Sequence, residues 1–226
     1  MTGLADTILA RLDETYPSAA DPARAAGAAR YMRDQFGFLG LTAPQQTRLA
    51  RTVLAGLAAP TEPDLVAVAR GCWQRPEREY QYFACTYLRR HVALASPRLL
   101  PTVRDLITTK SWWDTVDTLA AHTVGPLVAR YPELVSTMDD WAVDENLWLV
   151  RTAILHQLTY GRRTDADRLF RYCLRQAGHR DFFIRKAIGW ALRQYARTDP
   201  VAVRSFVEEH SSLLAPLSVR EAVRHL

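Results

Sequence analysis

Apolar side chains recur at intervals of three and four residues along nearly the whole chain, and prolines mark where these repeats begin. Asp21-Pro22, Ser96-Pro97 and Asp199-Pro200 each place a capping side chain before a proline that suits the first turn of a helix. No run alternates between apolar and polar residues for long enough to predict a strand. The sequence therefore predicts an all-α protein.

The predicted helices are short and closely spaced. We expect them near residues 3–15, 22–38, 43–58, 62–73, 76–93, 97–109, 111–130, 133–142, 145–160, 165–177, 181–197, 201–210 and 217–225. Their lengths and short loops favour antiparallel helix pairs stacked into an α-solenoid, a curved superhelix with a concave groove. Since no linker or low-complexity tract divides residues 1–226, we expect a single domain.

Charge indicates the class of partner. The formal net charge is +5, and Lys110 and Lys186 are the only lysines among 29 Lys and Arg residues. Guanidinium groups bind phosphate through two parallel hydrogen bonds and stack on aromatic faces. A basic groove of this kind makes nucleic acid the first expected partner.

The sequence lacks the features of membrane, secreted, metal-binding and nucleotide-dependent proteins. No apolar run is long enough for a membrane span, and the first residues lack a signal peptide, so we expect a cytoplasmic protein. Cys72, Cys85 and Cys173 lack disulfide or zinc spacing and are expected to be buried thiols. The six histidines form no metal motif, and no glycine-rich phosphate loop is present. We therefore expect neither a metal nor a nucleotide cofactor.

The helix predicted over 111–130 carries an aromatic side chain and an anion on one face. Trp113 and Asp117 are four residues apart, so a carboxylate lies beside a large ring. Both groups attract cations, and their attraction grows as water is excluded. Trp112 belongs to the apolar stripe, and Asp114 sits in the first turn, where it complements the helix dipole. Trp113 and Asp117 are thus the candidates for chemistry on a cation.

The helix predicted over 181–197 has a polar face of unusual composition. Its apolar stripe is complete without Trp190, which lies on the other side with Lys186, Arg193 and Arg197. A ring among three cations suits contact with a sugar or base together with neutralisation of phosphates. The alternative is a tryptophan that packs on a neighbouring repeat.

The helix predicted over 145–160 has a core stripe of Leu147, Val150, Ile154 and Leu158, and an adjoining face that contains Trp148 and Arg151. Arg151 is a candidate phosphate ligand. Trp148 is expected to pack against the next helix.

At these segments the chain resembles the AlkD family of bacterial alkylpurine DNA glycosylases, which are built from HEAT-like helical repeats. The strongest resemblance lies in three tryptophan-containing strings, KSWWDTVD at 110–117, WLVRTAIL at 148–155 and FFIRKAIGW at 182–190. Shorter matches are ARYMR at 29–33, FLG at 38–40, LTAP at 41–44, PERE at 76–79 and APLSVREA at 215–222.

The resemblance implies roles for individual residues. It makes Asp117 the catalytic carboxylate, Trp113 and Trp190 the aromatic walls around the deoxyribose of the lesion, and Arg151 a contact to a backbone phosphate. Tyr31 and Arg193 match family positions that face DNA. Lys186 and Arg197, on the cationic face, complete the predicted DNA contacts.

The expected activity is hydrolysis of the N-glycosidic bond of cationic N3- or N7-alkylated purines in duplex DNA. The resemblance implies that the base need not be extruded. The absence of metal and nucleotide motifs predicts a reaction without a cofactor, and a single helical array that binds duplex DNA needs no second subunit, so we expect a monomer. Strand cleavage would need an amine nucleophile, and neither lysine suits that role. Three alternatives stay open: a non-catalytic binder of DNA structures, a protein-interaction scaffold, and a glycosylase specialised for bulky natural-product adducts in self-resistance.

Overall fold

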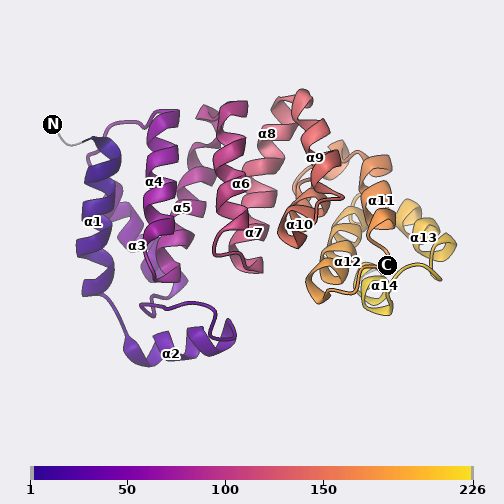
Figure 1. The fold of residues 1–226 in the computed structure, drawn as a ribbon, viewed down its shortest axis with the longest axis horizontal. Helices are drawn as coiled ribbons and strands as arrows, with labels where there is room; N and C mark the ends of the chain where they lie inside the picture. Colours follow the sequence, from indigo (N-terminus) through magenta and orange to yellow (C-terminus); the bar gives the residue numbers. More distant parts are fainter. Residues whose placement is uncertain (1–2, 225–226) are drawn as a thin grey trace. The chain divides into compact units, whose positions relative to one another are not determined.

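The computed structural model describes residues 3–224 and confirms the all-α fold (Figure 1). No described residue belongs to a β-strand, although one isolated bridge joins Gly37 and Glu77. The chain forms two compact units that divide after Thr102, and each consists of packed helices joined by short loops. No helix within residues 3–224 is long and apolar enough to cross a membrane.

The first unit contains α1 to α5, which span Leu4–Ser18, Pro22–Tyr31, Ala43–Leu54, Glu62–Gln74 and Arg78–His91. Helix α4 packs between α1 and α5, and α3 packs against α1. Leu12, Leu65 and Leu88 are buried at these contacts. Helix α6, Leu100–Thr108, crosses the division between the units.

The second unit contains α7 to α14, which span Trp113–Leu119, Gly125–Arg130, Val135–Trp141, Leu147–Leu155, Ala166–Arg175, Phe182–Ala196, Pro200–Glu209 and Pro216–Ala222. Helix α10 packs against α7 and α12, and α12 packs along α14. These four helices carry the candidate site.

The predicted helix starts and the cysteine prediction are confirmed. The side chains of Asp21, Ser96 and Asp199 each accept a hydrogen bond from a backbone N–H of the turn that follows. The three cysteines are free and buried.

The prediction of a helix over 22–38 is wrong beyond Tyr31, where α2 ends. Arg33 and Asp34 both have positive φ angles, 56° and 55°, which a right-handed helix cannot contain. The chain then continues without a helix to Gly40, and the buried Glu79 carboxylate accepts hydrogen bonds from the backbone N–H groups of residues 39–41. This distant carboxylate compensates for the helical hydrogen bonds that the segment lacks.

Other helix ends also differ from expectation. The helix predicted over 145–160 ends at Leu155, and the one over 43–58 ends at Leu54. The helix predicted over 111–130 begins at Trp113, because Trp112 is extended, and it contains a π-helical turn over Ala120–Val124 between α7 and α8. The last residue of the helix predicted over 217–225 lies outside the described residues.

Candidate active site

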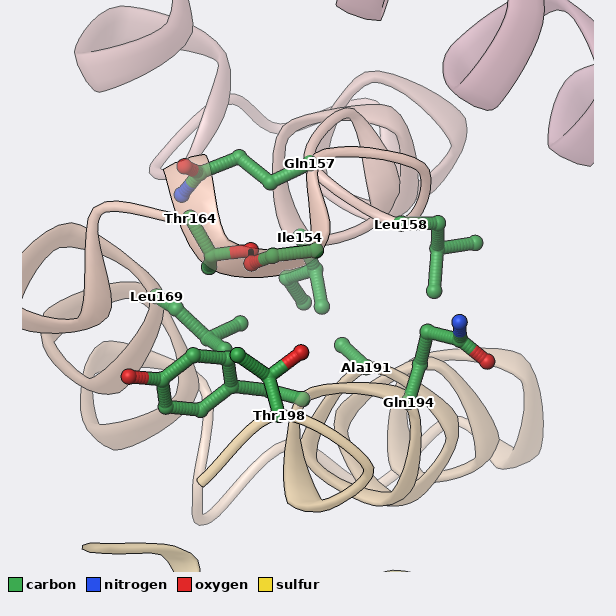
Figure 2. Close-up of a pocket in the computed structure, with 10 residues that line it drawn as sticks. Ile154, Gln157, Leu158, Thr164, Leu169, Ala191, Gln194 and Thr198 are labelled. Carbon is green, nitrogen blue, oxygen red and sulfur yellow. Dashed lines mark hydrogen bonds between the residues drawn. The ribbon is translucent and has the colours of Figure 1, made fainter.

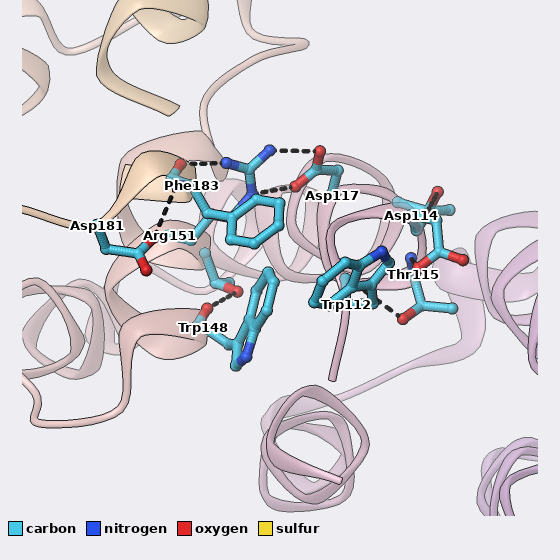
Figure 3. Close-up of polar contacts among 10 residues, drawn as sticks. Trp112, Asp114, Thr115, Asp117, Trp148, Arg151, Asp181 and Phe183 are labelled. Carbon is cyan, nitrogen blue, oxygen red and sulfur yellow. Dashed lines mark hydrogen bonds and ion pairs between the residues drawn. The ribbon is translucent and has the colours of Figure 1, made fainter. Parts of the chain in front are cut away.

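The Asp117 carboxylate is held by the guanidinium group of Arg151 (Figure 3). Arg151 Nε donates to Oδ1 over 2.6 Å, and Nη2 donates to Oδ2 over 2.7 Å. Both side chains are largely buried, with 12% of Asp117 and 5% of Arg151 exposed. Two parallel charge-assisted hydrogen bonds fix the position and the plane of the carboxylate.

Burial and the ion pair act on Asp117 in opposite directions. Burial raises the pKa of the Asp117 carboxyl above its ordinary value, while the hydrogen bonds and charge of Arg151 oppose that rise. The site therefore holds a partly desolvated carboxylate whose charge interacts strongly with a nearby cation.

Arg151 differs from the expectation of an outward-facing phosphate ligand. It is buried together with Thr152 and Leu155, so α10 is covered on more sides than the predicted stripe indicates. Nη1 donates to the backbone carbonyl of Phe183 at the start of α12, which leaves two of the five N–H donors outside these three bonds. A phosphate contact by Arg151 stays a prediction and would have to use those two donors.

An aromatic cluster supports the Arg151 contact. Trp112, Trp148 and Phe183 pack around one another with ring centroids 5.0–6.0 Å apart, and Figure 3 shows the three rings below the ion pair. The side chain of Asp181 also caps α12 by accepting the Phe183 N–H. Trp148 therefore has a packing role, but its ring contacts Trp112 and Phe183 of α12 and not the next helix, α11. The cluster fixes the carbonyl that orients Arg151.

The three predicted catalytic residues line one cavity of about 290 Å³. Trp113 and Asp117 reach it from α7, and Trp190 reaches it from α12. Arg151, Phe182, Phe183, Lys186, Arg193 and Glu221 complete the lining. The cavity thus combines aromatic walls with two carboxylates and three cations.

Two predicted DNA ligands at this cavity are paired with a carboxylate. Lys186 Nζ donates to Glu221 Oε1 over 2.9 Å, and Arg193 Nη1 donates to Glu221 Oε2. These interactions lower the pKa of the Glu221 carboxyl, with the Lys186 hydrogen bond as the largest cause. Glu221 is therefore ionised at neutral pH.

Arg197 and Tyr31 are not among the residues that line this cavity. Arg197 is exposed at the C-cap of α12 and is not among the residues around the cavity. Tyr31 ends α2 in the first unit, where 72% of its surface is exposed. Their predicted contacts to DNA stay predictions.

Sequence periodicity did not single out Glu221 or Phe183. Phe183 contributes a ring and a backbone carbonyl, and the sequence contains no local sign that this carbonyl would bind Arg151. Glu221 lies 35 positions after Lys186, so only the packing of α14 on α12 brings the two together. Both residues do belong to strings that carry the family resemblance, which is the one indication in the sequence that they belong to the site.

Comparisons with known proteins show the family of the chain. A family model described as DNA alkylation repair enzyme matches residues 12–226. The chain belongs to this family. It is also similar to a solved structure titled "Predicted DNA alkylation repair enzyme from Enterococcus faecalis", with 32% identity and a TM-score of 0.84 over 92% of this chain and 96% of that one. No curated protein matches the chain significantly.

Membership of the DNA alkylation repair family assigns the chain a role in alkylation repair and DNA as its partner.

No group of three or more potential metal-binding side chains occurs within residues 3–224. Another cavity of the second unit, between α10, α11 and α12, is lined by Gln157, Gln194, Thr198 and apolar side chains (Figure 2). Its volume of about 20 Å³ leaves room for little more than a water molecule, so it cannot hold a nucleotide.

Proposed function

We propose that this protein is a DNA glycosylase that hydrolyses the N-glycosidic bond of cationic N3- and N7-alkylated purines in duplex DNA. The observation that carries the proposal is the cavity shared by Asp117, Trp113 and Trp190. A buried carboxylate that shares a cavity with two indole rings stabilises a cation that forms there. Family membership supports DNA alkylation damage as the source of that cation.

The substrate makes much of the chemistry easy. An N3- or N7-alkylated purine carries a positive charge, so the bond from C1′ to the base breaks with its electron pair moving to the purine, which leaves as a neutral base. The positive charge then develops on the deoxyribose as an oxocarbenium ion. Asp117 stabilises this ion and orients a water molecule whose oxygen bonds to C1′, and the water's proton passes to the carboxylate or to solvent.

Arg151 prepares Asp117 for this role. The two hydrogen bonds favour the ionised carboxylate against the effect of burial, and they fix its orientation before substrate binds. Trp113 and Trp190 exclude bulk water and offer their ring faces to the sugar. We expect a monofunctional reaction, because strand cleavage would need an amine nucleophile and the Lys186 amine donates to Glu221.

The size of the cavity supports catalysis without extrusion of the base. At about 290 Å³ it lies at the lower limit of small-molecule sites, which span roughly 300–1,000 Å³. The charged residues suit contact with the sugar and phosphates of the damaged nucleotide. The base can then stay outside the cavity, unlike in enzymes that enclose a flipped nucleotide.

Base release provides the direct test. Purified protein is mixed with duplex DNA that contains a single N7-methylguanine, and free base is measured over time against the uncatalysed rate. We expect protein-dependent release of the methylated base with the phosphodiester backbone intact. Release at the uncatalysed rate, under conditions in which binding to the same duplex is demonstrated, would contradict the proposal.

A non-catalytic role in binding DNA structures is the second candidate, because the basic residues would also serve it. Affinity for lesion-free gapped and branched DNA, compared with affinity for the alkylated duplex, separates the two functions. Preference for branched DNA together with no base release would favour the binder. The combination of Asp117 with Trp113 and Trp190 in one cavity counts against the binder, since binding to DNA alone does not call for this combination.

A further inference from the structure

Glu221 is placed at the cavity by an unusually close approach of two helices. A Cβ atom at Gly189 of α12 would lie 2.5 Å from Glu221 Cβ and 2.9 Å from the backbone oxygen of Ser218, so only glycine permits this packing of α14. The buried Ser218 hydroxyl also donates to the backbone oxygen of Arg185 over 2.9 Å. The position of the Glu221 carboxylate is therefore set by two specific contacts between α12 and α14.

The Glu221 carboxylate engages two cations that lie about two turns apart on α12. Lys186 and Arg193 are seven residues apart, and each donates to a different oxygen of Glu221. Arg193 is also within 3.5 Å of the Glu221 backbone oxygen. Without this carboxylate, two long side chains that repel each other would sample many rotamers at the rim of the cavity.

The balance of charge leaves the site ready for an anion. Three cations and two carboxylates line the cavity, so positive charge is in excess by one, and each oxygen of Asp117 accepts one hydrogen bond from Arg151. Lys186 uses one of its three N–H donors on Glu221, so two donors remain for a ligand. The cations that Glu221 orients are therefore still able to bind a phosphate of the damaged strand.

We propose that Glu221 is a positioning residue that holds Lys186 and Arg193 as a preorganised pair for the phosphate of the damaged nucleotide. The proposal rests on the glycosylase function for the identity of that phosphate. It makes Glu221 an acidic residue that strengthens binding to a polyanion, because the order it imposes on two cations outweighs its own repulsion of DNA.

The expected direction of the effect on DNA affinity makes the proposal testable with Glu221→Gln. The substitution adds one unit of positive charge, so simple electrostatics predicts tighter binding. The matched control is Glu209→Gln, the same charge change at an exposed residue of α13. Affinity is measured by fluorescence anisotropy for a duplex that carries a stable abasic-site analogue, over a range of salt concentrations.

We expect Glu221→Gln to weaken binding on the order of 10-fold, as for loss of a charge-assisted hydrogen bond, and to reduce the slope of log K against log salt by about 1. Glu209→Gln should bind as well as the native protein or better. Equal or tighter binding by Glu221→Gln, relative to the control, would overturn the proposal.

A double-mutant cycle separates positioning from a purely structural role of Glu221. Glu221→Gln should have little further effect on binding when Lys186 and Arg193 are both replaced by glutamine; an undiminished effect in that background would overturn the proposal. If Glu221→Gln fails to fold, Glu221→Asp serves instead, because it keeps the negative charge on a side chain that is too short to contact both cations. Unchanged DNA binding by Glu221→Asp would also count against the proposal. These are binding measurements, so a failure of the glycosylase proposal would appear separately as absent base release.

Discussion

Asp117 is the residue whose surroundings are hardest to explain by stability alone. Asp117 and Arg151 form a buried ion pair, and the attraction between such charges barely offsets the cost of removing them from water. A protein with apolar residues of similar volume at these positions is therefore usually as stable. Here the pair lines the same cavity as the indole rings of Trp113 and Trp190. The arrangement suits a group that must remain charged while water is partly excluded.

Replacing Asp117 by Asn tests this at the level of chemistry. The amide retains the shape of the side chain but cannot supply a negative charge to the oxocarbenium ion. We expect base release to slow by roughly 10²–10⁴ in single-turnover assays. Binding to the alkylated duplex should be unchanged or slightly tighter, because a negative charge is removed. Loss of binding in step with loss of rate would instead indicate a structural role.

The pH profile follows from the same group. Asp117 acts in its ionised form, and burial raises its pKa, so activity should decline on acidification at a pH above the ordinary range of an aspartate. The lowered pKa of Glu221 keeps that residue charged over the same range. The measurement is the single-turnover rate between about pH 4 and 9, corrected for uncatalysed release. A rate that stays constant down to the ordinary pKa of aspartate would contradict this account.

Among the helices, the segment from α7 to α8 is the most specialised. Its π-helical turn, Ala120–Val124, lies directly after the residues that carry Trp113 and Asp117, and such turns often occur near functional sites. The Thr159 and Tyr160 hydroxyls donate to the backbone oxygens of Ala121 and Gly125 in this region. Side chains from beyond α10 thereby stabilise a turn whose regular hydrogen bonding is interrupted.

Gly125→Ala should destabilise this element. An added Cβ would lie 2.2 Å from the backbone oxygen of His156, and a backbone atom cannot move aside as a flexible side chain can. We expect a cost of about 1–3 kcal/mol, seen as a lower midpoint in thermal unfolding. Gly178→Ala is the control, since its Cβ would meet no atom within 4 Å. Equal unfolding midpoints for the two variants would show that α8 and α10 can separate at little cost.

The elements also show what sequence could and could not predict. Periodicity and proline caps identified the helices, because local burial and capping determine them. They could not identify the non-helical segment after α2, where a carboxylate 38 or more positions away accepts hydrogen bonds from the backbone of Gly40 and Leu41. Likewise, Asp117, Trp113 and Trp190 were recognisable locally, whereas the partners Arg151–Asp117 and Glu221–Lys186 depend on how α10, α12 and α14 pack.

At the scale of the whole molecule, charge and aromatic side chains are distributed over both units. The net charge of +5 and the predominance of arginine favour binding to the phosphate backbone, which is independent of sequence. The exposed Tyr31 in the first unit stays a predicted DNA contact. Recognition that relies on backbone contacts would leave the damaged base with few protein contacts of its own.

The last prediction concerns the size of the lesion. If catalysis acts on the sugar and phosphates at a cavity of about 290 Å³, the size of the alkyl group should matter little, because the base is not enclosed. We expect a bulky N3-adenine adduct and N7-methylguanine to be excised with rate enhancements within about one power of ten, or about 1.4 kcal/mol in activation free energy. The measurement compares single-turnover release from matched duplexes, each corrected for its uncatalysed rate, and Asp117→Asn should slow both.

A bulky adduct that binds normally but resists excision would show that the base must enter a confined pocket. Much faster excision of the bulky adduct than of the methyl lesion would instead favour a glycosylase specialised for self-resistance.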